Sequence, residues 1–419
     1  MIVGVRHDDL RRQNRAMVIA AVRRAGQPSR TEIAAATALS HSTISTISAS
    51  LIEERIVIEA GGSETAASRR GRPQVALGLN PGAASVVAVV LSLNALSATL
   101  IDYAGREIAK DVSRPSTLTL SRAELVEAVV AAVRRVLARA EAGAGPVLRM
   151  ALGIQGITDS AARTLLWSPI SPHSDVAFAD ALEAEFGVPA TVENDCNMIA
   201  VALKGRAPQR YRDNFVAVLL SNGIGMGLML RGSLFSGSRS SGGEFGHMTH
   251  IPDGALCRCG RRGCIEAYAG NYAILRHARG RGEDAPPAAD IDDATMLELA
   301  QAARARPGRE REAFARAGEA LGFGLGSLFA LIDPAPVALV GHGTSAFDMI
   351  EPAMRAALAR TAGGRREAAL SFDLEADETP LIREGCARQA LGFVDHEIFA
   401  PGLAPAAEAA APDYASRIA

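Results

Sequence analysis

The start of the chain follows a pattern of short amphipathic helices separated by polar turns. Residues 9–24 carry their apolar side chains on one side, which predicts a helix. Ser29 and Glu32 have the spacing of a capping box, in which the hydroxyl and the carboxylate satisfy reciprocal backbone donors at a helix start. A second, short helix therefore follows and ends at a tight turn over residues 37–39.

A third helix is predicted over residues 41–55, with Ser40 as its cap. Ile44, Ile47 and Leu51 recur at helical spacing and form its buried face. Its opposite face offers small or polar side chains that can meet base edges and phosphates, namely His41, Ser42, Ser45 and Thr46. A short helix, a tight turn and a helix with a polar outer face are typical of a helix-turn-helix.

A β-hairpin with a basic tip is predicted next, with strands over residues 56–59 and 75–77. Its arginines could reach phosphates or the minor groove. We therefore expect residues 1–80 to form a winged helix-turn-helix DNA-binding domain. The alternative is a small helical subdomain with a solvated hairpin. The predicted DNA contacts are Arg30, Ser40, His41, Ser42, Thr43, Ser45, Thr46, Arg69, Arg70 and Arg72.

After a linker at residues 80–82 the pattern becomes α/β. Ser121 and Glu124 form a second capping box and open a predicted amphipathic helix. Residues 279–317 are charged, alanine-rich and expected to be largely helical, with a break at a proline pair. The tail at residues 401–419 is rich in alanine and proline and is predicted to be disordered. The expected strands span residues 85–93, 95–102, 147–154, 188–192, 215–220, 226–230 and 337–340.

Composition and charge agree with a DNA-binding head on a ligand-binding body. The chain has 419 residues, which suggests two or three domains, and its net charge is −2. Residues 1–80 hold 11 arginines and 7 acidic residues, a net of +4, so the remainder carries −6. The first ten residues lack a signal-peptide pattern, and no apolar run reaches the ~20 residues of a membrane span. We therefore expect a cytoplasmic protein.

One histidine and three of the five cysteines suggest a metal site: His247, Cys257, Cys259 and Cys264. One imidazole and three thiolates suit tetrahedral zinc, and four protein ligands would make the zinc structural. Cys257 and Cys259 are too close in sequence for an unstrained disulfide. The alternative is a set of free reduced thiols.

Two further segments carry carboxylates beside possible turns. Residues 193–197 follow a predicted strand and offer a carboxylate that could accept a sugar hydroxyl or act as a general base. Glu244 lies just before the predicted metal ligand His247, and Glu266 lies just after the cysteines. The alternatives are an Asn-Asp turn and an exposed glycine loop. Glycine-rich turns at residues 222–227 and 341–344 could approach phosphate, although glycines also make ordinary hairpins.

These segments together resemble the ROK family of repressors, open reading frames and kinases, to about residue 400. The most specific matches are residues 193–195, 243–247 and 257–266, and residues 39–43 and 71–73 resemble the repressor branch, because the family's kinases lack that head. The resemblance implies an α/β fold of two actin-like (ribonuclease H-like) lobes around a sugar cleft. Lobe 1 would span residues 83–200, completed by a C-terminal helix at 382–400, and lobe 2 with the zinc loop would span 201–381.

The resemblance also implies five sugar contacts: Asn194, Asp195, Glu244, His247 and Glu266. Asp195 would stand where the kinases keep their catalytic base. His247 would bind zinc while its other edge faces the sugar.

The chain departs from the kinases at their phosphate loops. Val90-Leu91-Ser92-Leu93-Asn94 stands where the kinases have Asp-x-Gly-Gly-Thr, and Ser221-Asn222 stands where they have Gly-Thr. The Gly-Trp of the kinase substrate loop is missing from residues 168–173. Phosphoryl transfer depends on positioned, charge-neutralised phosphates, so we expect no ATP or Mg²⁺ and regard Asp195 as a vestigial base position.

The first hypothesis is a sugar-responsive transcriptional regulator, a repressor of carbohydrate genes. It would bind operator DNA as a homodimer or homotetramer and take a sugar or sugar phosphate between its lobes. The alternative from the enzyme class is an ATP-dependent sugar kinase, similar to a glucokinase or an N-acetylhexosamine kinase, with an accessory head. A third hypothesis is regulation by a protein partner without a small effector.

Overall fold

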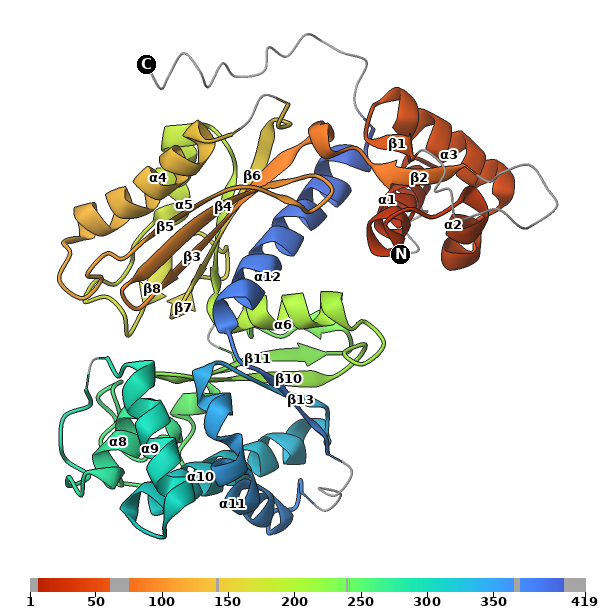
Figure 1. Cartoon of the computed structure of the whole chain (residues 1–419). Helices are drawn as coiled ribbons and strands as arrows, with labels where there is room; N and C mark the ends of the chain where they lie inside the picture. Colours follow the sequence, from red (N-terminus) through yellow and green to blue (C-terminus); the bar gives the residue numbers. More distant parts are fainter. Residues whose placement is uncertain are drawn as a thin grey trace.

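The computed structural model describes residues 7–60, 75–140, 143–238, 240, 242–288, 290–364 and 370–402. It has a small helical head beside a body of two α/β lobes, and one long helix connects the three parts (Figure 1). The head consists of α1 (His7–Ala25), α2 (Arg30–Thr37), α3 (His41–Glu53), β1 (Val57–Ala60) and β2 (Ala76–Leu79).

Local sequence signals fix the helices of the head. The predicted capping box at the start of α2 is present, with both the Ser29 and the Glu32 side chains engaged. Ala38 adopts a left-handed conformation that ends α2, and Ser40 caps α3. β1 and β2 pair antiparallel, which confirms the predicted strands. The segment between them, residues 61–74, lies outside the described residues, and so do the predicted tip arginines Arg69, Arg70 and Arg72.

Lobe 1 is a five-stranded mixed sheet in the order β5-β4-β3-β6-β9. Alternate residues of β3 face its two sides: Val87 and Val89 pack toward α4, while Val86 and Ala88 join the core beneath α12. The elements are β3 (Ser85–Ser92), β4 (Ala95–Asp102), β5 (Glu107–Ser113), α4 (Arg122–Ala138), β6 (Val147–Ile154), β7 (Ile157–Thr158), β8 (Leu165–Trp167), α5 (Phe178–Phe186) and β9 (Ala190–Asn194).

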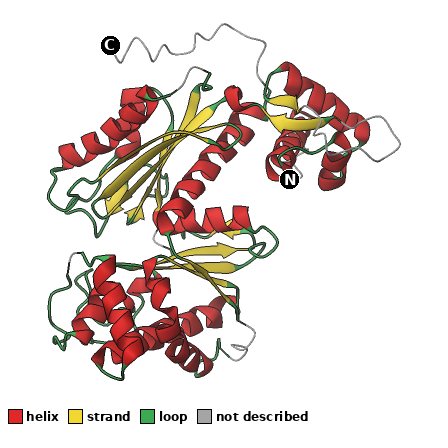
Figure 2. Cartoon of the chain, in the orientation of Figure 1, coloured by secondary structure: helices red, strands yellow, loops and turns green. Residues whose placement is uncertain are grey.

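Lobe 2 repeats the topology of lobe 1, with the strand order β12-β11-β10-β13-β14. In each lobe three antiparallel strands continue into two parallel ones, and helices cover both faces (Figure 2). This duplication confirms the predicted two-lobed actin-like fold. The elements are β10 (Phe215–Leu220), β11 (Ile224–Leu230), β12 (Ser233–Leu234), α7 (Glu266–Ala269), α8 (Asn271–Ala278), α9 (Asp293–Ala305), α10 (Arg309–Ile332), β13 (Val337–Val340), α11 (Phe347–Ala359) and β14 (Phe372–Glu375).

The helical expectation for residues 279–317 was partly wrong. The described residues between the end of α8 at Ala278 and the start of α9 at Asp293 form no helix. Gly280 has a positive φ of 64°, and a proline pair follows. Further along, α10 is long and apolar enough to cross a membrane, but 56% of its apolar window is buried. Its partners are the neighbouring helices of lobe 2, as expected for a core helix.

Two helices form the junction of the lobes. α6 (Asp195–Arg206) lies on the sheet of lobe 2, where Gly225 and Gly227 of β11 allow a close approach to Cys196. α12 (Glu378–Phe393) lies on the sheet of lobe 1, contacts α6 and continues as a π-helical turn over Val394–Phe399. Figure 1 shows α12 running from the junction of the lobes to the head.

Buried charges join the head to the end of α12. The Nε and Nη2 atoms of Arg23 each donate to the Asp395 carboxylate at 2.8 Å. The Tyr103 hydroxyl donates to the same carboxylate at 2.6 Å. Arg15, only 2% exposed, donates to Glu54 and to the backbone carbonyl of Phe399. These charge-assisted hydrogen bonds lie in a largely buried cluster and hold the head against the end of α12.

Candidate functional site

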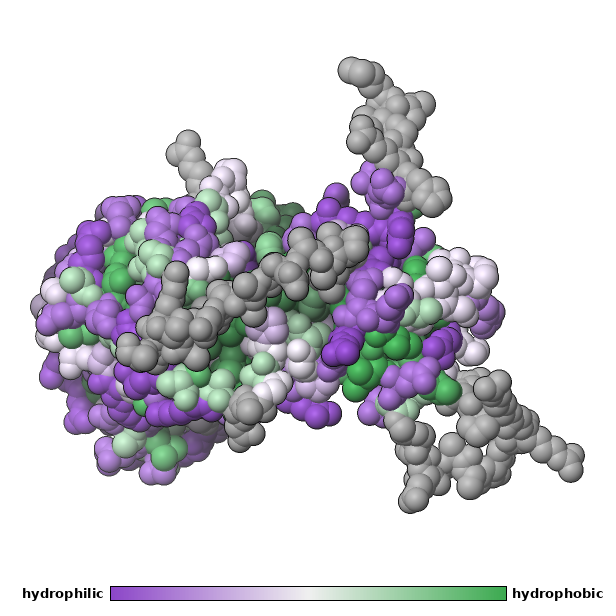
Figure 3. Space-filling view, turned by 90° about the horizontal axis from the view of Figure 1, so that it is seen from above, coloured by the Kyte–Doolittle hydropathy of each residue, from purple (hydrophilic) through white to green (hydrophobic). Residues whose placement is uncertain are grey.

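The outer face of α3 is exposed in the part of the chain that the structure describes. Ile44, Ile47 and Leu51 are buried as predicted. The predicted contact residues His41, Ser42, Ser45 and Thr46 are exposed on the opposite side. The head projects from the body, so a long ligand could approach it (Figure 3). A helix with small polar side chains on an open face has the shape needed to enter a major groove.

Several predicted DNA-contacting residues already have partners within the head. The Ser40 hydroxyl accepts from the Thr43 amide at 3.1 Å and lies 2.8 Å from the Thr43 hydroxyl. The Thr46 hydroxyl donates to the Ser42 carbonyl at 3.1 Å. Arg30 lies 3.3 Å from Glu59 in an exposed ion pair. Ser40 therefore serves to cap α3. Of the described side chains, those of His41 and Ser45 are the most available to contact DNA.

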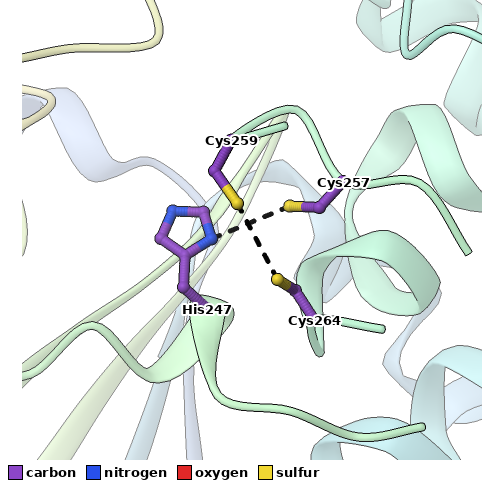
Figure 4. A group of neighbouring side chains, drawn as sticks. All are labelled: His247, Cys257, Cys259 and Cys264. Carbon is purple, nitrogen blue, oxygen red and sulfur yellow. Dashed lines mark hydrogen bonds between the residues drawn. The ribbon is translucent and has the colours of Figure 1, made fainter. Parts of the chain in front are cut away.

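The predicted metal ligands converge from one loop and one short helix. Figure 4 shows the side chains of His247, Cys257, Cys259 and Cys264 pointing toward one another. Their ligand atoms all lie within 4.8 Å of one another. His247 ends a 3₁₀ helix, Cys257 and Cys259 lie in the loop, and Cys264 lies two residues before the first residue of α7.

The spacing of these atoms fits a tetrahedral ion. Bonds of about 2.3 Å from zinc to sulfur place two ligands of a tetrahedron about 3.8 Å apart. Cys259 Sγ and Cys264 Sγ are 3.8 Å apart, and Cys257 Sγ and His247 Nδ1 are 3.7 Å apart. Burial raises the pKa of the Cys264 thiol to about 11, with Cys259 as the next cause. A divalent cation would supply the positive charge that such crowded thiolates need.

The shape of the loop depends on glycine. Gly263 has a φ of +77°, and a Cβ there would lie 1.7 Å from the carbonyl oxygen of Ile251. Only glycine allows this approach, which brings Cys264 beneath Cys257 and Cys259.

The five predicted sugar-contacting residues line one cavity between the lobes: Asn194, Asp195, Glu244, His247 and Glu266. His247 links this cavity to the metal ligands. Its Nδ1 faces Cys257, while its Nε2 lies 3.8 Å from the Glu244 carboxylate. A metal bound through Nδ1 would therefore fix the ring edge that borders the cavity.

Asp195 begins α6 at the bottom of the cavity and is 5% exposed. Burial raises the pKa of its carboxyl to about 7, although the Cys196 amide, 2.8 Å away, donates to it. Nearby Glu378 and Glu244 raise this pKa further. The Asp195 carboxyl can therefore change its charge near neutral pH.

The other polar groups of the cavity are also held by backbone contacts. The side-chain nitrogen of Asn194 donates to the Gly156 carbonyl at 2.8 Å. Its side-chain oxygen accepts from the backbone amide of Asn197 at 3.1 Å. Glu266 accepts from the Ile224 amide at 3.1 Å and from the Tyr272 hydroxyl at 3.3 Å. Burial raises the pKa of Glu244, and the neighbouring Glu266 adds to this rise.

Trp167, which the sequence-based predictions did not include, lines the same cavity at the end of β8. Its ring lies in a T-shaped arrangement with His247, with ring centroids 6.2 Å apart, so it connects lobe 1 to lobe 2. The available signal was that Trp167 is the single tryptophan of the chain. Distance along the sequence gave no reason to place it beside His247.

The two segments that stand at the expected positions of the kinase phosphate loops meet at Asp290, which the sequence did not predict as a site residue. The Asn222 side-chain amide donates to Asp290 at 3.0 Å, and that of Asn94 donates to the same carboxylate at 3.4 Å. The Ile291 amide donates to the Asn222 side-chain oxygen at 3.2 Å. A carboxylate of lobe 2 thus bridges the turn of the β3–β4 hairpin and the turn before β11.

Asp195→Asn tests the buried carboxyl. The folded protein raises this pKa from 3.8 to about 7, so it binds more protons than the unfolded chain between these pH values. The wild type must therefore lose stability as pH rises through this window, and the asparagine variant must escape this loss. We expect the melting temperature of the variant, relative to wild type, to be higher at pH 8 than at pH 5. Asp213→Asn, which removes an exposed carboxylate, is the control, and an equal difference at both pH values would contradict the assignment.

Known structures share the fold of the chain. A ROK family transcriptional regulator that is a homologue of the E. coli MLC protein matches with a TM-score of 0.75 and 21% identity, over 94% of this chain and 99% of its own. A ROK glucokinase from Streptomyces griseus, solved with glucose and AMPPNP, matches with a TM-score of 0.56 and 24% identity. That match covers 73% of this chain and 99% of the kinase, so a substantial part of this chain has no counterpart in the kinase.

Comparison with known sequences identifies the family of the chain. A putative xylose repressor from Caldicellulosiruptor sp. is 25% identical over 322 residues, which is 76% of this chain and 79% of the repressor. The model of the ROK family matches residues 93–377, well over half of the chain. The chain belongs to the ROK family.

Proposed function

We propose that this ROK protein is a sugar-responsive DNA-binding transcriptional regulator, a repressor of genes for carbohydrate uptake or metabolism. The observation that carries the proposal is the single chain of contacts that joins an open recognition helix to a polar cavity between two lobes. The relative named as a putative xylose repressor, which matches over most of its length, supports this function.

In this proposal α3 enters the major groove of operator DNA. His41, Ser42, Ser45 and Thr46 face the bases, and Arg30 with the arginines of the predicted wing, Arg69, Arg70 and Arg72, contacts phosphates. A homodimer or homotetramer presents two such helices about 34 Å apart, one turn of DNA, and so reads a palindromic site.

α12 carries the signal from the cavity to the head. In its first turn, the Glu378 carboxylate accepts a hydrogen bond from the Ser221 hydroxyl at 3.3 Å. Further along the helix, the Gln389 side chain donates to the Glu193 carboxylate at 2.7 Å. Its far end holds Arg23 through Asp395. Sugar binding favours one angle between the lobes, and the helix that spans their junction turns the head with it.

Kinase activity is lost in this proposal. The side chains of Asn94 and Asn222 replace the threonines of the kinase loops and both bind the Asp290 carboxylate. A negative group between these loops repels the phosphates of ATP, and no described loop residue replaces the missing metal-binding aspartate. Asp195 then accepts a sugar hydroxyl without activating it.

The alternative kinase function is supported by the retained Asp195, and a coupled ADP-release assay with a panel of sugars separates the two. We expect no sugar-dependent ADP release above the protein-free rate. Release that Asp195→Asn abolishes would identify a working kinase and overturn this part of the proposal.

The His247 and cysteine cluster holds one structural zinc ion in this proposal, because its geometry fits four protein ligands. We expect one zinc per chain by elemental analysis, and we expect Cys259→Ser and Cys264→Ala to lose it. Cys386→Ala, which removes a buried thiol far from the cluster, is the matched control and should keep its zinc. Full zinc content in both cluster variants would rule out this site.

Fluorescence anisotropy tests DNA binding directly, with DNA upstream of the gene as the probe. We expect selective, salt-dependent binding that one sugar shifts. Ser45→Glu adds a negative charge to the open face of α3, so it should weaken binding by about tenfold or more. Ser116→Glu makes the same change on the body and should leave affinity unchanged. Equal affinity for the upstream DNA and for a scrambled sequence would contradict the proposed regulator.

A further inference from the structure

We propose that the cavity between the lobes selects an uncharged monosaccharide and rejects phosphorylated sugars, with Trp167 as the wall against which the sugar ring stacks. This inference rests on the proposed function, which places the effector in this cavity, and it names the chemical class of that effector. Three features of the cavity carry it: the charge of its lining, the state of its backbone donors and the position of its aromatic side chain.

The lining of the cavity is acidic. Asp195, Glu244 and Glu266 all border it, and none of the described residues that line it is an arginine or a lysine. Proteins bind sugar phosphates with arginine forks, lysines or clustered backbone amides. A phosphate dianion placed among these carboxylates gains no counter-charge and is repelled in a partly buried site.

Three backbone donors that could hold an anion in this cavity are already occupied. The start of α6 is the natural anion site of this cavity, but Asp195 accepts from the Cys196 amide at 2.8 Å and Asn194 accepts from the Asn197 amide at 3.1 Å. At the turn before β11, Glu266 accepts from the Ile224 amide at 3.1 Å. The chain's own side chains therefore take three of the backbone amides that a phosphate could use.

The same groups suit a neutral sugar. Carboxylate oxygens accept hydrogen bonds from hydroxyl groups, and each has further lone pairs after its backbone contact. Trp167, Ile157 and Pro169 of lobe 1 also line the cavity and give part of its wall an apolar surface. A sugar ring has C–H groups on its face and hydroxyls on its rim, so it can pack its face on Trp167 while its rim meets the carboxylates.

The single tryptophan of the chain makes this testable in the full-length protein, because its emission reports this cavity alone. The probes are xylose, glucose and N-acetylglucosamine, with glucose 6-phosphate and N-acetylglucosamine 6-phosphate as charged partners. We expect at least one neutral sugar to change the emission saturably, and every phosphate ester to bind at least about tenfold more weakly. A phosphate ester that binds as tightly as a neutral sugar, or more tightly, overturns this inference but leaves a sugar-responsive regulator standing. Absence of binding by all five compounds, checked by calorimetry, overturns the sugar response itself.

Calorimetry on variants tests the stacking wall with the neutral sugar found above. Trp167→Leu keeps an apolar side chain without an aromatic face and should weaken binding by about tenfold. Trp167→Phe keeps an aromatic face and should stay within about threefold of wild type. Zinc content and melting temperature show whether each variant is folded. Equal affinity in the folded leucine and phenylalanine variants would refute stacking on Trp167.

Discussion

The charge pair between Arg23 and Asp395 is the interaction on which the rest of this architecture depends. Asp395 is 4% exposed and receives two hydrogen bonds from Arg23 and one from Tyr103, so the head, lobe 1 and the end of α12 meet at one carboxylate. Removing one partner of such a pair would leave a buried charge, which costs about 3–5 kcal/mol. These hydrogen bonds hold the head on the end of α12, and in the proposed function a movement of α12 moves the head with it.

A second constraint acts on the cavity, because its carboxylates already accept hydrogen bonds from the protein backbone. Asp195 and Glu266 each satisfy a backbone donor at a helix start or a turn. Their remaining lone pairs face a site without a described cationic side chain. A kinase needs positive charge near its phosphates, whereas Asp290 puts a negative charge between the corresponding loops. In the proposed function the same fold therefore holds sugar without transferring phosphate to it.

Local features of the sequence predicted much of this arrangement. The capping box of Ser29 and Glu32 and the spacing of Ile44, Ile47 and Leu51 identified the head, because helix ends and helix faces are set by near neighbours. The cysteine spacing identified a cluster that the structure brings together. Trp167, Asp290 and Asp395 escaped prediction because their partners, His247, Asn94 and Arg23, lie far away along the chain. Such contacts depend on how the lobes and the head meet, which periodicity does not encode.

The central claim of the proposed function is that a signal from the cavity passes through α12 to the head. The direct measurement is operator affinity with and without saturating sugar, compared between wild type and Asp395→Asn. Asp213→Asn, which makes the same change at an exposed position of lobe 2, is the control. The account predicts that sugar changes the affinity of wild type and of the control by about fivefold or more. It also predicts that Asp395→Asn still binds the operator but no longer responds to sugar. A full sugar response in folded Asp395→Asn would contradict the coupling and require another route from the cavity to the DNA.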